Sequence, residues 1–95
     1  MDVLKFIAEN RLVAISRQVY GDNLLESAKA IVDGGIKLLE ITFDQADSDC
    51  LKLTPSSISL VKKTLGDKIC VGAGTVMTVE QARAAKDAGA DFALA

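Results

Sequence analysis

The 95-residue sequence contains no histidine and no tryptophan, only one proline and two cysteines, and few aromatic residues. Without histidine, Ser-His-Asp triads, a histidine general base and most zinc sites are excluded. Cys50 and Cys70 lie in dissimilar contexts without metal-ligand spacing, so we expect reduced structural thiols and no metal site. No apolar run reaches the ~18 residues of a membrane span, and the N-terminus lacks the layout of a signal peptide. These features predict a cytoplasmic protein with no membrane partner.

Positive charge is also too sparse for a nucleic-acid site. The 11 lysines and arginines are outnumbered by 13 acidic residues, the net charge is −2, and the basic residues form no stripe. We therefore expect no nucleic-acid partner. The hydrophobic content of 49% predicts one small domain over residues 1–95, with a core of Ala, Val, Ile and Leu.

Short apolar runs alternate with amphipathic segments along the chain. The expected strands are 12–16, 36–43, 68–73 and 90–95, and the expected helices are 2–9, 23–33, 55–65 and 79–88. Such alternation is typical of right-handed βαβ units with a parallel sheet.

Capping signals predict where the helices begin and end. Three pairs of residues have the spacing or order of a helix start: Asn23 with Glu26, Thr54 with Pro55, and Thr78 with Gln81. The middle pair makes 44–54 an expected loop. Gly34-Gly35 and Gly89 are expected to end the helices that precede them.

The chain also repeats a pattern. Residues 26–35 resemble residues 80–89, with an offset of 54 positions from Glu26 to Glu80. Two successive βα units at that spacing would form one internal repeat. Convergent use of an Ala-rich helix followed by a glycine cap is the alternative.

Polar residues lie at the carboxyl ends of three of the expected strands: Arg17, then Glu40 with Thr42, then Thr75. Ligands of parallel α/β folds gather at the carboxyl ends of the strands. Glu40 lies between Leu39 and Ile41, where an ionised carboxylate is costly to bury unless it is paired, hydrogen-bonded or used. It is interpreted as a general acid/base that would face the interior if the sheet closes into a barrel. Pairing with Arg17 on the neighbouring strand is the alternative, and the two can hold together.

The other site candidates carry two interpretations as well. Alternation places Leu38, Glu40 and Thr42 on one face of their strand, and Leu39, Ile41 and Phe43 on the helix-packing face. Arg17 suits a carboxylate or phosphate ligand, or is an ordinary surface arginine. The glycines of 72–75 admit a ligand close to the backbone, or allow tight strand–helix packing.

Four segments in succession carry a resemblance: residues 13–17 (VAISR), 34–43 (GGIKLLEITF), 71–76 (VGAGTV) and 88–95 (AGADFALA). They resemble the 2-keto-3-deoxy-6-phosphogluconate (KDPG) and 4-hydroxy-2-oxoglutarate (KHG) aldolases, in matching order from about Leu12 onward. The resemblance implies a TIM (β/α)8 barrel, usually a homotrimer, of which residues 1–95 would form the N-terminal half. That half would comprise a leading helix, (βα)3 and a fourth strand.

The resemblance also implies a chemistry. Members are class I lyases of carbohydrate metabolism that release pyruvate and an aldehyde through a Schiff base, with no metal or other cofactor. Glu40 matches the general acid/base, Thr75 the threonine that holds the pyruvate carboxylate, and Arg17 a basic residue near the substrate. Thr42 and Gly74 adjoin them as expected substrate-binding residues. Asp44 stands where several members have an arginine that contacts pyruvate, and an acid there would repel a keto acid.

The family's Schiff-base lysine lies at the end of the sixth strand, and its phosphate site is built from later strands. We therefore expect the 95-residue chain to be inactive alone. A four-stranded piece would expose its edges and its inner face, which predicts either part of a longer enzyme or self-association. The alternative functions are a non-catalytic self-associating half-barrel and another βα-barrel enzyme of small phosphorylated metabolites.

Overall fold

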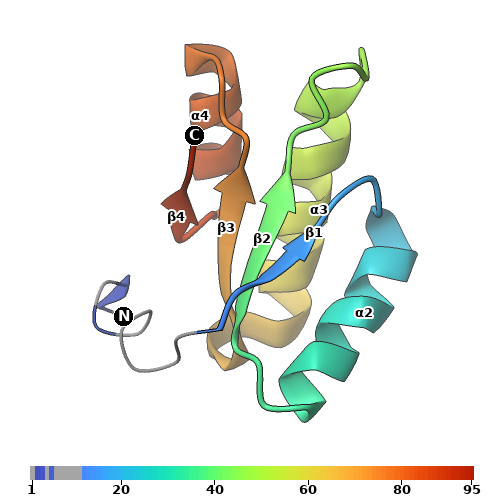
Figure 1. The fold of residues 1–95 in the computed structure, drawn as a ribbon, viewed down its shortest axis with the longest axis vertical. Helices are drawn as coiled ribbons and strands as arrows, with labels where there is room; N and C mark the ends of the chain where they lie inside the picture. The colour runs from blue at the N-terminus through green and yellow to red at the C-terminus, as the bar shows by residue number, and fades with distance from the viewer. Residues whose placement is uncertain (1, 4, 6–11) are drawn as a thin grey trace.

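The computed structural model describes residues 2, 3, 5 and 12–95, which form a sheet with helices on one side (Figure 1). In chain order the elements are β1 (Ala14–Ser16), α2 (Gly21–Asp33), β2 (Leu38–Thr42), α3 (Cys50–Leu65), the 3-10 turn Gly66–Lys68, β3 (Cys70–Gly74), α4 (Val79–Asp87) and β4 (Phe92–Ala93). The strand order is β1-β2-β3-β4 and every neighbouring pair is parallel. The predicted α/β class with successive βα units is confirmed.

The strand alternation expected for β2 is present. Leu39, Ile41 and Phe43 are buried in one core with residues of α2 and α3, including Leu24, Ala28, Ile58 and Val61. Leu38, Glu40 and Thr42 are buried on the other side of the strand and lie outside that core cluster. The core therefore lies between sheet and helices, and the second face of the sheet carries the candidate site residues.

Two helix ends repeat one hydrogen-bonding pattern at the predicted offset. After α2, the Gly35 N–H donates to the Val32 carbonyl and the Ile36 N–H to the Ile31 carbonyl. After α4, Gly89 and Ala90 make the equivalent bonds to Lys86 and Ala85. Gly35 and Gly89 have φ of 93° and 98°, which glycine adopts without strain. The repeated sequence thus encodes a repeated helix end.

Two predicted helix starts were wrong. α2 begins at Gly21, with Tyr20 as N-cap, so Asn23 lies inside the helix and its side chain caps nothing. α3 begins at Cys50, so Thr54 and Pro55 lie inside it and part of the expected loop is helical. The Thr54 hydroxyl donates to the Thr42 carbonyl at 2.9 Å, which satisfies both groups in the interior and favours the longer helix.

The third predicted start was right in position. Thr78 is the N-cap of α4, and its hydroxyl accepts a hydrogen bond from the Gln81 N–H at 3.0 Å. The Gln81 side chain does not return to Thr78 but accepts from the Met77 N–H at 2.9 Å. The predicted leading helix 2–9 falls largely outside the described residues, although the Asp2 carboxylate accepts from the Lys5 N–H at 3.2 Å, as an N-cap would.

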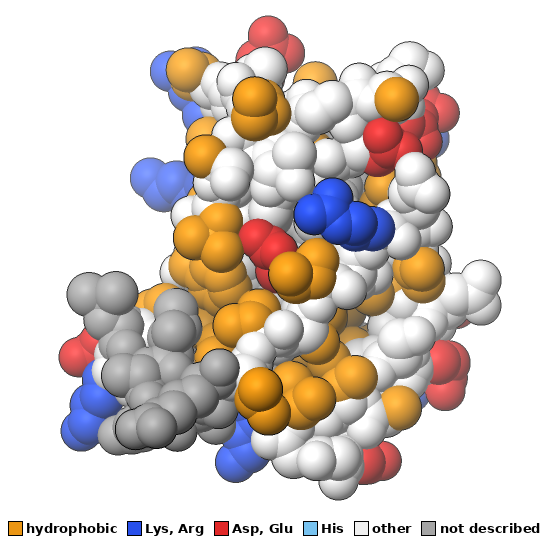
Figure 2. Space-filling model, viewed as in Figure 1, with side chains coloured by type: hydrophobic (Ala, Val, Ile, Leu, Met, Phe, Trp, Pro, Cys, Tyr) orange, Lys and Arg blue, Asp and Glu red, His pale blue; other side chains and the backbone are white. Residues whose placement is uncertain are grey.

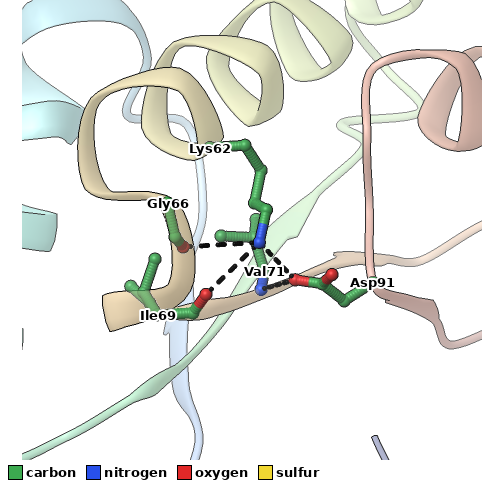
Figure 3. A network of polar contacts seen from close by, with 5 residues as sticks. All are labelled: Lys62, Gly66, Ile69, Val71 and Asp91. Atoms are coloured by element: carbon green, nitrogen blue, oxygen red, sulfur yellow. Dashed lines mark hydrogen bonds and ion pairs between the residues drawn. The ribbon is translucent and has the colours of Figure 1, made fainter. Parts of the chain in front are cut away.

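An ion pair reinforces the backbone pairing of the last strand with β3. Lys62 of α3 donates to Asp91 at 2.9 Å, and the same Asp91 oxygen accepts from the Val71 N–H of β3 at 2.8 Å (Figure 3). Lys62 also contacts the Gly66 and Ile69 carbonyls at 3.5 and 3.4 Å. This network joins α3, β3 and the start of β4 on the side away from the candidate site.

The sheet face opposite the helices is exposed in part. Hydrophobic side chains gather over the strands there, around a few charged ones (Figure 2). Ile15 of β1 and Leu94, just after β4, are 58% and 51% exposed. Phe92 of β4 covers Gly72, where a Cβ would overlap its ring.

Candidate functional site

A pocket of about 290 Å³ lies where β1, β2 and β3 end. It is lined by Arg17, Gln18, Thr42, Phe43, Asp44, Gln45 and Thr75. Three of the residues predicted from the sequence, Arg17, Thr42 and Thr75, are thus brought together from three different strands. Their meeting point is the sheet edge at which parallel folds bind ligands.

Glu40 lies beneath this pocket rather than in its wall. Its side chain is only 7% exposed and occupies the space in which a Cβ at Gly74 would lie. In the strand register Glu40 pairs with Gly72, whereas Gly74 pairs with Thr42. The Glu40 carboxylate therefore leans by one same-face position toward the carboxyl end of the sheet, which is the end where the pocket opens.

The two interpretations of Glu40 are distinguished by its contacts. Among residues 2, 3, 5 and 12–95 the structure records no hydrogen bond or ion pair from Glu40 to Arg17. The ion pairs in that part of the chain are Lys29–Glu26 and Lys62–Asp91. The alternative Glu40–Arg17 pair is therefore not formed within these residues.

The two threonines of the pocket differ in what their hydroxyls do. The Thr42 hydroxyl donates to the Ser16 carbonyl at 3.2 Å and so links β2 to β1. The Thr75 hydroxyl and N–H donate to no atom of the described residues. Two donors on one residue at a pocket wall suit a carboxylate oxygen, because both can point charge-assisted hydrogen bonds at it.

Backbone strain is concentrated at the pocket. Thr75 and Gln18 have φ of 54° and 60°, and both line it. A β-branched residue in the left-handed region costs of order ~1–3 kcal/mol and persists only where its surroundings hold it. Such outliers cluster at functional sites, and neither could be read from the sequence because both residues are common in strands and loops.

Asp44, the residue that departs from the family pattern, is held by local hydrogen bonds. One carboxylate oxygen accepts from the Ala46 N–H at 3.0 Å, and the other accepts from the Gln18 side chain at 3.2 Å. These two donors partly offset its charge at the pocket wall.

Sequence reasoning missed three glutamines, of which Gln18 and Gln45 line the pocket. Gln45 donates to the Thr75 carbonyl at 2.8 Å and pairs with Gln81, which is 5% exposed. No short motif marks these contacts, since they join residues 30 and 36 positions apart. The capping position of Gln81 was the one signal available.

No lysine lines the pocket, although the structure describes every lysine in the sequence. Lys37 and Lys68 precede β2 and β3, at the opposite end of the sheet, and Lys62 is engaged by Asp91. Within the described residues no group of three or more His, Cys, Asp or Glu could hold a metal ion.

Comparison with known proteins identifies the family. A family model described as "KDPG and KHG aldolase" matches residues 3–95. The chain belongs to this family. It is 38% identical over 65 residues to a 2-dehydro-3-deoxy-phosphogluconate aldolase of Treponema pallidum, and 29% identical over 91 residues to one of Haemophilus influenzae. These matches include 68% and 95% of this chain but only 28% and 39% of the relatives.

A solved structure agrees with these matches. It is a 4-hydroxy-2-oxoglutarate/KDPG aldolase from TTHB1, with a TM-score of 0.71 and 31% identity over 98% of this chain. That alignment covers 42% of the solved chain. The chain thus spans less than half the length of the aldolases it matches. No helix among the described residues is long and apolar enough to cross a membrane.

Proposed function

We propose that this chain forms the N-terminal part of a class I aldolase that cleaves KDPG or 4-hydroxy-2-oxoglutarate to pyruvate and an aldehyde. The observation that supports it most is the convergence of Glu40, Thr75 and Arg17 at one sheet end in a member of the aldolase family. Homo-oligomer formation, a homotrimeric assembly and a cytoplasmic location remain predictions from the sequence.

We assign each site residue a role that its position supports. The Thr75 N–H and hydroxyl bind one end of the keto-acid carboxylate, and the Arg17 guanidinium supplies the opposite charge. Glu40 lies below them with its carboxylate leaning toward the pocket. There it exchanges a proton with the substrate as a general acid/base. Thr42 lines the pocket, and the missing side chain of Gly74 gives Glu40 its room.

The covalent step needs an amine that the pocket does not contain. A Schiff base forms when a desolvated lysine attacks the substrate carbonyl, and none of the lysines of this sequence lines the pocket. We infer that the 95-residue chain binds pyruvate without reacting with it, and that the amine comes from a segment present in the longer relatives.

Pyruvate titration followed by ¹H–¹⁵N NMR tests this proposal. Shifts are expected at the amides of Thr75 and Gly74, and binding should weaken in Thr75→Val and Arg17→Met. Lys29→Met, on the outer surface of α2, is the matched control for lost positive charge and should bind as the unmodified chain does. Shifts spread over residues far from the pocket, or equal binding by all variants, would contradict it.

A self-associating half-barrel is a second candidate, because the outer strands carry exposed apolar residues. Ile15 and Leu94 are more than half exposed on or beside the edge strands, and unpaired edges favour pairing with another chain. Light scattering distinguishes the cases: a dimer that Ile15→Lys dissociates supports self-association, and a concentration-independent monomer excludes it.

A further inference from the structure

Two glutamines outside the predicted site form a reciprocal pair beside Thr75. The Gln45 amide nitrogen donates to the Gln81 side-chain oxygen at 3.1 Å, and the Gln81 nitrogen donates to the Gln45 oxygen at 2.9 Å. Gln45 comes from the loop after β2 and Gln81 from the first turn of α4. The pair therefore joins the two loops that follow neighbouring strands.

Backbone groups fix the orientation of both amides. The Gln45 nitrogen also donates to the Thr75 carbonyl at 2.8 Å, so this end must be the NH₂ group. The Gln81 oxygen also accepts from the Met77 N–H at 2.9 Å, so that end must be the carbonyl. The Gln81 nitrogen also donates to the Cys50 sulfur, at a nitrogen–sulfur distance of 3.8 Å. Neither amide can turn over without losing bonds at both ends.

The pair holds the two peptides that follow Thr75, whereas the peptide before it is held by the bond from the Phe43 N–H to the Gly74 carbonyl, at 2.9 Å. Thr75 has φ 54°, its carbonyl is bound by Gln45, and two residues later the Met77 N–H is bound by Gln81. Gln81 is 5% exposed, so its bonds are shielded from water on one side, while Gln45 reaches it from the surface. A left-handed threonine needs such external restraint.

We propose that Gln45 and Gln81 are positioning residues that keep Thr75 in the left-handed conformation and so hold its hydroxyl beside its own N–H for the ligand. Neither glutamine needs to touch the substrate for this. The expected effect on pyruvate binding rests on the proposed function. The restraint of the Thr75 backbone does not depend on it. The Gln45–Gln81 pair also links the loop after β2, which carries Asp44, to the loop after β3.

The test compares Gln45→Met and Gln81→Met, which keep side-chain length and remove the amide, with the unmodified 95-residue chain. The backbone φ of Thr75 is measured by HN–Hα couplings and residual dipolar couplings. Pyruvate affinity is measured in the same samples. Val61→Ala, a truncation in the core far from the pair, is the control for lost stability without lost positioning.

In both glutamine variants we expect Thr75 to leave the left-handed region. We also expect pyruvate affinity to fall about tenfold, as for the loss of one well-placed hydrogen bond. The double variant should lose little more than either single one, because the residues act as a unit. In Val61→Ala, the Thr75 conformation should be retained.

A left-handed Thr75 in folded Gln45→Met overturns the inference, whatever pyruvate does. If a variant fails to fold, the Thr75 conformation is measured in Gln45→Glu instead. This substitution keeps the size of the side chain and the residue Gln81, but it removes both N–H donors of Gln45. If the unmodified chain fails to bind pyruvate while Thr75 moves in the variants, the proposed function fails and the positioning role stands.

Discussion

The Glu40 carboxylate occupies the space above Gly74 in which a Cβ at position 74 would lie. The two residues are not paired across the strands, since Glu40 is opposite Gly72. Their contact shows that the side chain leans along the sheet toward the pocket. The direction of the Glu40 side chain, and not a turn, thus requires glycine at position 74.

Gly74→Ala should displace Glu40 and weaken the fold. Overpacking of a closed site of this kind costs about 1–3 kcal/mol of unfolding free energy, and the pocket should lose its acid/base. Chemical denaturation measures the first effect and the carboxyl ¹³C signal of Glu40 the second. Gly34→Ala is the matched control: an added Cβ there meets only ordinary contacts of 3.5 and 3.6 Å and φ is negative. An unmoved Glu40 signal in Gly74→Ala would contradict the contact.

Thr78→Ala should lower the free energy of unfolding by about 1 kcal/mol, because the Gln81 N–H loses its cap. Asn23→Ala provides the contrast. Asn23 lies three positions before Glu26, which is the spacing of a capping box, but the structure places it inside α2. Its replacement should therefore change the free energy of unfolding by less than about 0.5 kcal/mol. Urea denaturation of both variants checks the pair. Equal losses would mean that α2 begins at Asn23 after all.

Asp91→Asn should destabilise the chain by about 1–3 kcal/mol, as expected for a hydrogen bond between charged groups that is largely shielded from water. Asp91 and Lys62 have side chains 21% and 20% exposed. Glu26→Gln tests the exposed Lys29–Glu26 pair, whose side chains are 46% and 75% exposed, and should cost less than about 0.5 kcal/mol. Thermal unfolding at two salt concentrations compares them. A loss in Asp91→Asn that vanishes in high salt would show that the ion pair is a surface contact.

Cys70 should resist thiol reagents until the solution is strongly alkaline. Burial, followed by the charge of Asp91, raises its pKa from 9.0 to about 11. The native state holds the thiol proton more tightly than the unfolded state does. Stability from this group is therefore complete below pH 9 and is lost as the pH rises from about 9 to about 11. Reaction with a chromogenic disulfide in the Cys50→Ala background measures the thiolate. Rapid labelling at pH 8 without unfolding would contradict the prediction.

Particular residues show what the sequence could and could not predict. The strands were predictable because their apolar runs are short and are bounded by glycines and polar residues, as at 36–43. The start of α3 was not, because Pro55 matches an N1 position. In the structure it removes only a donor to the Leu51 carbonyl, at a residue that is 43% exposed to water.

The candidate site also has features that the sequence predicts and features that it does not. Arg17, Thr42 and Thr75 were predictable because each lies at or just after the carboxyl end of a strand, and parallel strands end at one edge of the sheet. The lean of Glu40, the left-handed Thr75 and the Gln45–Gln81 pair were not, because each depends on contacts between residues distant in sequence.

The most direct test of the proposed aldolase role is borohydride trapping with pyruvate on two chains in parallel. One is the 95-residue chain, and the other is the same chain extended at its C-terminus with the remaining segment of the solved aldolase it matches. We predict a reduced pyruvate adduct on the extended chain alone, on a lysine of the added segment, and a loss of its catalytic turnover in Glu40→Gln. An adduct on any lysine of the 95-residue chain, or a folded extended chain that forms no adduct, would contradict the account.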